Sequence, residues 1–69
     1  MELNIGDKIY QVNDGKIQHI YNVDKVTKYL AYSGLFQFNR NAFRGRVTPV
    51  GKIQKWDFSV YYLENKKLN

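Results

Sequence analysis

The sequence predicts an all-β protein: a small barrel of about five bent antiparallel strands. Short runs rich in Val, Ile, Thr and aromatic residues alternate with clusters of Gly, Asn, Asp and Ser, a pattern typical of strands joined by turns. A chain of 69 residues without Cys has no disulfides and little room for a core. Six Tyr, four Phe and one Trp are therefore expected to supply much of the buried surface.

The first hairpin is a strong local feature. Residues 8–12 are rich in β-formers and follow Gly6-Asp7, and Asp14-Gly15 comes next. Asp-Gly between two β-rich runs predicts a hairpin because Gly accepts a positive φ without steric cost. We expect residues 8–12 to form an edge strand that is open to pairing with a partner or with a second copy.

Residues 16–32 change face within one run. The first apolar set shares one strand face: Ile17, His19, Tyr21 and Val23. The second set has the opposite parity: Val26, Lys28 and Leu30. A β-bulge near Asp24-Lys25 reconciles the two sets, because one extra residue reverses the face and bends the strand. A helix with Asn22 as its N-cap and Gly34 just past its end is the alternative, although Val, Thr and Tyr favour a strand.

The remaining segments complete the predicted sheet. Ser33-Gly34 is expected to form a tight turn before a strand at residues 35–40. Residues 39–51 are predicted to form a loop with one short extended piece at residues 46–48. Pro49 is not expected within a central strand, because it lacks the N–H that would bond to a neighbouring strand.

The final run alternates cleanly between two faces. One face is predicted to hold Trp56, Phe58, Val60 and Tyr62, and the other to hold Lys55, Asp57, Ser59 and Tyr61. The barrel domain is predicted to cover residues 1–63, and residues 64–69 to form a polar tail that frays.

Two resemblances rest on these segments. Residues 5–10, Ile-Gly-Asp-Lys-Ile-Tyr, with a hairpin Gly soon after, resemble the first hairpin of SH3-like and KOW-type barrels. Residues 23–28, Phe38-x-Arg40 and residues 56–63 are similar to short uncharacterised phage-encoded proteins. The resemblances imply a small SH3-like barrel and, for a phage-encoded chain, a place in the host cytoplasm.

Positive charge is concentrated in the middle of the chain. Residues 25–56 contain seven Lys and Arg and no acid, within a net charge of +5 for the whole chain. Residues 35–46 combine three Phe with three Arg. Cations that neutralise phosphates and rings that stack on bases are typical of surfaces that bind single-stranded nucleic acid. The plain alternative is a charged surface that keeps a small protein soluble.

We therefore predict non-specific binding of DNA or RNA. Phe43 is the expected stacking ring, because Phe36 and Phe38 share a strand face and are candidates for the core. Asn39 and Asn41 are candidates for hydrogen bonds to base edges. The prediction requires the cations to share one surface and not to pair with carboxylates. The predicted nucleic-acid-binding residues are Lys28, Arg40, Phe43, Arg44, Arg46, Lys52 and Lys55.

A protein-interaction module is the alternative function. Tyr and Arg are enriched in protein interfaces, so an outward-facing Tyr61 near Arg40 or Arg44 suits docking on an acidic surface of a host protein. Such a partner is, for example, a nucleic-acid enzyme or a defence complex. The chain is expected to be a monomer or a homodimer.

Catalytic and cofactor chemistry is not indicated. His19 is the single His and there is no Cys, so a metal site lacks a second nitrogen or a sulfur ligand. The same single His leaves Ser and Thr without a plausible triad, and no phosphate-binding Gly loop occurs. We predict no enzymatic activity, no metal and no cofactor, with His19 an ordinary strand residue.

Targeting signals are not indicated either. No apolar run approaches the ~18–20 residues that cross a bilayer, and residues 1–4 do not begin a signal peptide. The absence of Cys fits a reducing compartment. We expect a cytoplasmic protein that has no membrane partner.

Overall fold

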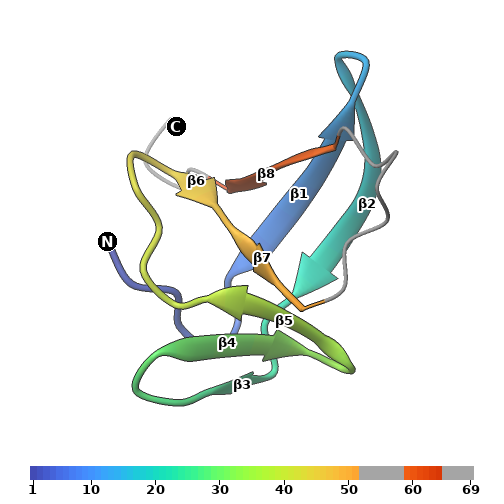
Figure 1. The fold of residues 1–69 in the computed structure, drawn as a ribbon. Coiled ribbons are helices and arrows are strands. Elements are labelled where there is room, and N and C mark those ends of the chain that lie inside the picture. Colours follow the sequence, from blue (N-terminus) through green and yellow to red (C-terminus); the bar gives the residue numbers. More distant parts are fainter. Residues whose placement is uncertain (52–58, 65–69) are drawn as a thin grey trace.

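Two four-stranded antiparallel sheets make up the computed structural model, which describes residues 1–51 and 59–64 (Figure 1). The strand orders are β2-β1-β8-β6 in the first sheet and β3-β4-β5-β7 in the second. The strands are β1 (Lys8–Asn13), β2 (Lys16–Asn22), β3 (Lys25–Val26), β4 (Leu30–Ser33), β5 (Phe36–Asn39), β6 (Arg46–Val47), β7 (Pro49–Val50) and β8 (Val60–Leu63). The all-β prediction is confirmed, with more and shorter strands than expected. The described residues form no helix, so none among them has the length and apolarity to span a membrane.

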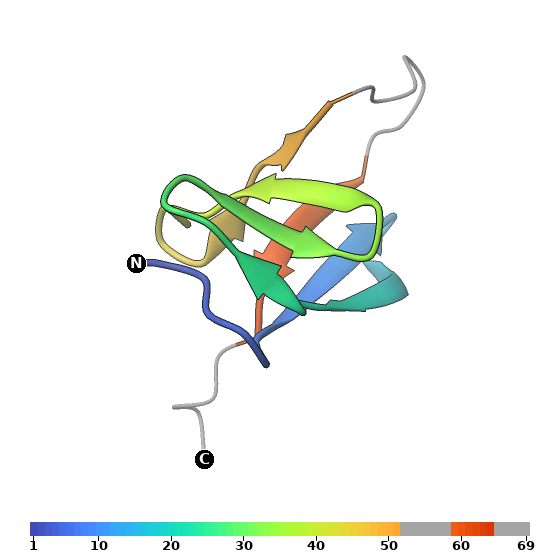
Figure 2. The same ribbon diagram turned by 90° about the horizontal axis from the view of Figure 1, so that it is seen from below.

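The first strand lies inside its sheet. β1 pairs with β2 on one side and with β8 on the other, so the prediction that residues 8–12 form an edge is wrong. The local pattern of β1 gave no sign of this, because its second partner comes from the far end of the chain. Figure 2 shows the second sheet lying across the first, with β4 and β5 in front of β1 and β8.

Positive backbone φ angles mark the two hairpin tips that the sequence predicted. Asp14 (φ 55) and Gly15 (φ 74) form the tip between β1 and β2. Two left-handed residues are what a type I′ turn requires. Gly34 (φ 59) opens the tip between β4 and β5, and its amide donates a 2.8 Å hydrogen bond to the carboxylate of Asp24. Turn chemistry was therefore readable from single dipeptides.

Residues 16–32 form three strands in two sheets. The chain leaves the first sheet after β2, enters the second as β3, and reverses at residues 27–29 into β4. Both the continuous strand and the alternative helix are therefore wrong. The change of apolar parity reflects the passage from one sheet to the other, since β3 meets the core from a different layer than β2 does.

The β-bulge lies in β2 and not near Asp24. Gln11 pairs with His19, whereas Val12 pairs with Ile17, so Gln18 is the extra residue. The bulge reverses the face of the strand and turns Ile17 away from the core. The Ile17 side chain is 55% exposed as a result.

The core is built where the two sheets meet. Its buried apolar residues are Leu3, Ile9, Tyr21, Val23, Ala31, Phe38, Ala42, Val47 and Tyr61. The Tyr21 ring centre lies 4.9 Å from that of Phe36 and 5.5 Å from that of Phe38. Phe38 is 1% exposed, which confirms its place in the core, but Phe36 is 56% exposed. Both lie on one face of β5, yet Phe36 starts the strand beside the hairpin tip, where the sheet ends.

The last strand faces the core with the side opposite to the predicted one. Tyr61 is 9% exposed and pairs with Val47, which is also buried, whereas Tyr62 is 43% exposed. The predicted outward-facing Tyr61 is therefore wrong, because alternation fixes two faces but not which of them meets the core. Residues 52–58, which begin the predicted closing strand, lie outside the described residues.

The segments around β8 are also tied to the sheets. β6 covers residues 46 and 47 of the extended piece predicted at residues 46–48, and Pro49 lies in β7 at the edge of the second sheet, where a missing N–H is tolerated. The amide of Glu64 donates a 2.9 Å hydrogen bond to the carbonyl of Lys8, so the predicted tail is fastened at its first residue. Residues 65–69 lie outside the described part of the chain.

Candidate nucleic-acid interface

A tight two-residue turn presents two of the predicted arginines. Phe43 and Arg46 exchange backbone hydrogen bonds of 3.1 and 2.9 Å, and Arg44 and Gly45 form the tip between them. Both tip residues are left-handed, with φ 53 at Arg44 and φ 81 at Gly45. The side chains of Phe43, Arg44 and Arg46 are all exposed as a result.

This turn also brings rings and cations together. The Arg44 guanidinium carbon lies 5.4 Å from the ring centre of Phe43, which is 76% exposed. Arg46 pairs across β6 and β8 with Tyr62, which the sequence analysis did not select because Tyr61 seemed to be the outward tyrosine. We call Phe43, Arg44, Arg46 and Tyr62 the hairpin group.

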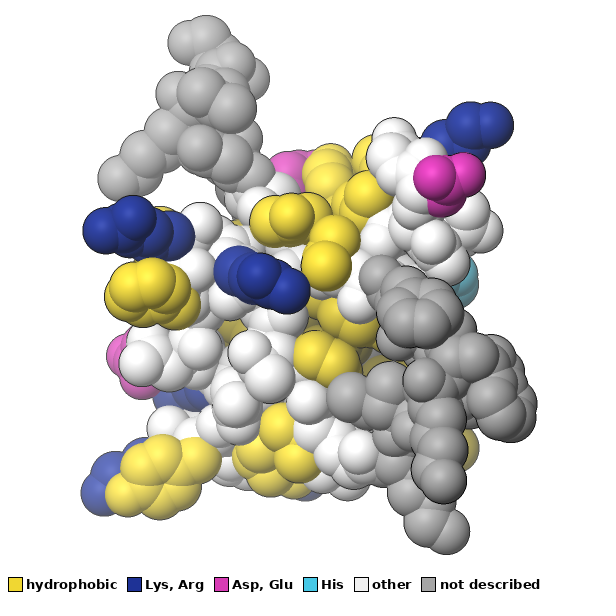
Figure 3. Space-filling view, turned by 45° about the horizontal axis from the view of Figure 1, so that its top comes forward, with side chains coloured by type: hydrophobic (Ala, Val, Ile, Leu, Met, Phe, Trp, Pro, Cys, Tyr) yellow, Lys and Arg dark blue, Asp and Glu magenta, His cyan; other side chains and the backbone are white. Residues whose placement is uncertain are grey.

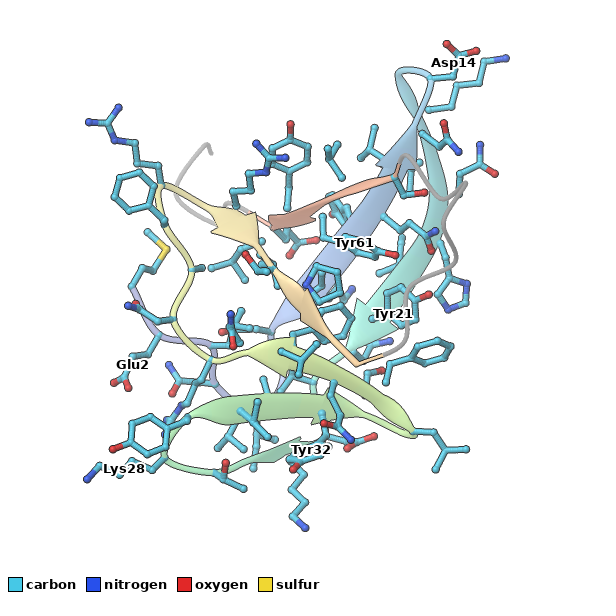
Figure 4. The ribbon with its side chains drawn as sticks, viewed as in Figure 1. Glu2, Asp14, Tyr21, Lys28, Tyr32 and Tyr61 are labelled. Atoms are coloured by element: carbon cyan, nitrogen blue, oxygen red, sulfur yellow. The ribbon has the colours of Figure 1, made fainter. Side chains whose placement is uncertain are left out.

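A shallow depression of about 670 Å³ lies at the opposite end of the connection between β5 and β6. It is lined by Glu2, Lys28, Tyr29, Asn39, Arg40 and Asn41. Tyr29 is 71% exposed, and the Lys28 ammonium lies 5.3 Å from the centre of its ring. Glu2 and Lys28 lie on the same side of the molecule in Figure 4. The depression thus joins four predicted residues to one ring, Tyr29, that the prediction omitted.

Arg40 is held by the protein itself. Its guanidinium nitrogens donate to the carbonyls of Leu3 (2.9 Å) and Thr27 (3.0 Å) and to the side chain of Asn4 (3.2 Å). These bonds occupy one N–H on each guanidinium nitrogen and fix the plane of the group. Arg40 therefore positions the walls of the depression, and fewer of its donors are left for a phosphate than the prediction assumed.

Residues 40–43 connect the depression to the hairpin group along one side of the molecule (Figure 1). Arg40 and Phe43 are three residues apart in the sequence, so an extended chain between them spans at most about 11 Å. Within the described residues, Lys28, Arg44 and Arg46 form no ion pair; Asp24 and Glu64 accept hydrogen bonds from Gly34 and Tyr10 instead. The predicted Lys52 and Lys55 lie outside the described residues.

The outer face of the first sheet carries several apolar side chains. Cross-strand pairing aligns Ile20, Tyr10, Tyr62 and Arg46 in one row and Ile17, Val12 and Val60 in the next. Figure 3 shows hydrophobic side chains gathered between separate Lys and Arg side chains on the visible face. The Tyr10 hydroxyl donates a hydrogen bond to the Glu64 carboxylate, and this bond raises the pKa of Tyr10 above its ordinary value.

The described residues offer little support for a metal site or for a role of His19. No group of three His, Asp or Glu side chains within residues 1–51 and 59–64 is arranged to hold a metal ion. His19 is exposed on β2, and its ring centre lies 4.4 Å from that of Tyr21.

Comparisons of the chain with protein-family models, with curated proteins and with solved structures give no match. The chemistry of the two surface groups is therefore the basis for a function.

Proposed function

We propose that this protein binds single-stranded nucleic acid with little sequence preference, through the hairpin group and the rim of the depression. One observation carries the proposal. Phe43 and Tyr29 are 76% and 71% exposed, and each has a cation within 5.4 Å of its ring centre. A ring beside a cation offers stacking to a base and charge to the neighbouring phosphate.

The backbone at Arg44 supports the same function. A left-handed conformation costs a non-glycine residue about 1–2 kcal/mol, and Asn or Gly tolerates it better than Arg does. Arg44 has φ 53 at the tip of its turn. An Arg kept at a strained and exposed position points to a use for the guanidinium group itself.

The binding of a labelled single-stranded oligonucleotide over a series of salt concentrations tests the proposal. The wild-type affinity is expected to fall with salt, and an Arg44→Ala/Arg46→Ala variant to show a slope smaller by about 1.4, since each lost phosphate contact removes about 0.7. Lys16→Ala/Lys25→Ala is the matched control, because it removes two exposed charges from the start of β2 and from β3, away from the hairpin group. An equal effect of both double variants would reduce the site to overall charge, and no binding at low salt would remove the function.

The outer face of the first sheet favours a second candidate, a module of the phage type that docks on a host protein. Ile17, Ile20 and Tyr62 are 55%, 44% and 43% exposed there, and apolar patches of this kind mark protein interfaces. Arg46 and Lys8 flank them, so the partner is expected to be apolar and acidic. An Ile20→Asp variant that still binds oligonucleotides but loses a stoichiometric protein partner supports this function.

We further propose that the two sheets belong to an SH3-like barrel. The support is that backbone hydrogen bonds hold two of the passages between the sheets, from β2 to β3 and from β6 to β7. The amide of Val23 donates to Asp7 at 2.9 Å beside the first passage, and that of Asn39 donates to Thr48 at 2.9 Å beside the second. Short strands that continue from one sheet to the next are typical of small barrels.

A further inference from the structure

We propose that the depression lined by Glu2, Tyr29 and Asn39 binds a guanine base of the nucleic-acid strand. The inference rests on the proposed function and gives it a preference for one base. Three charged side chains line the depression, the carboxylate of Glu2 and the cations Lys28 and Arg40, and the protein itself holds Arg40. A site for phosphate alone has no use for a carboxylate, whereas a site for a nucleotide uses charges of both signs.

Two polar side chains of the depression, those of Glu2 and Asn39, are available to a ligand. Neither the Glu2 carboxylate nor the side-chain amide of Asn39 has a hydrogen-bond partner among the described residues, and both residues are exposed. Glu2 pairs with Asn41 through an isolated bridge, which sets the two residues opposite each other. The walls are firm, because Arg40 is bonded to Leu3, Asn4 and Thr27 around the depression.

The chemistry of the bases selects guanine. A carboxylate accepts two hydrogen bonds side by side, and its negative charge repels carbonyl oxygens. Guanine is the one common base whose Watson–Crick edge presents two adjacent donors, N1–H and the N2 amino group. Uracil and thymine present one donor between two carbonyls, and cytosine and adenine present one amino group beside a ring acceptor. The side-chain amide of Asn39 supplies a donor and an acceptor for the remaining edge, and that of Asn41 supplies a donor, because its oxygen accepts a 3.4 Å hydrogen bond from the Met1 ammonium.

The neighbouring side chains complete a nucleotide site. The exposed Tyr29 ring offers a stacking surface to the base, as aromatic side chains do for unstacked bases in single strands. The Lys28 ammonium, 5.3 Å from that ring centre, is close enough to neutralise the attached phosphate. One base therefore meets a carboxylate, two amides, a ring and a cation within the same depression.

Fluorescence titration of uridine octamers at fixed low salt tests the inference. One octamer contains only uridine, and three others carry one central guanosine, adenosine or cytidine. The guanosine octamer is expected to bind at least about five-fold more tightly than the others, the lower limit for a well-formed pair of hydrogen bonds to a base. Glu2→Gln is expected to abolish this preference, because the amide offers only one acceptor.

Asp14→Asn is the matched control. It removes one negative charge from the tip of the β1–β2 hairpin, which Figure 4 shows far from Glu2, and Asn accepts the left-handed backbone of Asp14. Each variant is more positive than the wild type by one charge, but only Glu2→Gln is expected to lose the guanosine preference.

The outcomes separate the two proposals. Equal binding of the four octamers overturns the guanine site and leaves non-specific binding in place. A guanosine preference that survives in Glu2→Gln overturns the role of Glu2. Failure of every octamer to bind overturns the guanine site together with the proposed function.

Discussion

Arg40 and Leu3 are joined by two hydrogen bonds across 37 residues of sequence. The Arg40 Nε donates to the Leu3 carbonyl at 2.9 Å, and the Leu3 amide donates to the Arg40 carbonyl at 2.7 Å. The Leu3 side chain is fully buried in the core. A residue selected for its charge thus holds the first segment of the chain on the fold and shapes the candidate site beside it.

Replacement of Arg40 by Lys is expected to lower the free energy of unfolding by about 1–3 kcal/mol. Lys keeps the charge but lacks the planar fork that reaches Leu3, Asn4 and Thr27 together. Urea denaturation followed by circular dichroism measures the change. Arg44→Lys is the control and is expected to stay within about 0.5 kcal/mol of the wild type. Equal stability of the Arg40→Lys variant and the wild type would contradict the structural role of the guanidinium.

The two phenylalanines of β5 are expected to differ in their contribution to stability. Phe38→Ala leaves a cavity in the core and is expected to cost about 3–5 kcal/mol, a large part of the stability of a chain this short. Phe36→Ala removes a ring that is already 56% exposed and is expected to leave a cooperative thermal transition. Thermal denaturation of both variants decides this, and similar melting temperatures would refute the assigned packing.

Arg44→Asn is expected to change stability and binding in opposite directions. Asn tolerates the left-handed φ of 53 better than Arg, so the free energy of unfolding is expected to rise by about 1 kcal/mol. The salt slope of oligonucleotide binding is expected to fall by about 0.7 as one phosphate contact is lost. Chemical denaturation and the salt series measure the two effects on one sample. A variant that is more stable and binds as well as the wild type would show that Arg44 has no part in the site.

The Tyr10–Glu64 hydrogen bond makes stability sensitive to alkaline pH. The bond raises the pKa of Tyr10 in the folded protein, so its contribution is fully present below the unfolded value of about 10. That contribution is lost as the pH rises through the higher folded value, because the Tyr10 hydroxyl then loses its proton in the folded protein too and no longer donates to Glu64. The urea midpoint of the wild type is expected to fall more steeply than that of Tyr10→Phe as the pH rises above about 10. Parallel curves for the two proteins would argue against the bond.

Local chemistry determined the parts of the fold that were predicted correctly. Asp14-Gly15 and Gly34 specified their turns because positive φ angles are accessible to few residues, and Pro49 marked an edge because it lacks an N–H. The exposed Phe43 and the arginines of its turn were likewise selected from the sequence. Tyr29, Tyr62 and Glu2 were missed, since nothing near them in sequence shows that they border a site.

The sequence by itself determined an all-β chain, its two hairpin tips and the concentration of positive charge in its middle. Only the tertiary structure decided that β1 is an inner strand, that Tyr61 faces inward and Tyr62 outward, and that Arg40 is bound by the first residues of the chain. The physical reason is that strand alternation and turn geometry act over a few residues. The choice of the inner face and of sheet partners depends on contacts between segments that are far apart in the sequence.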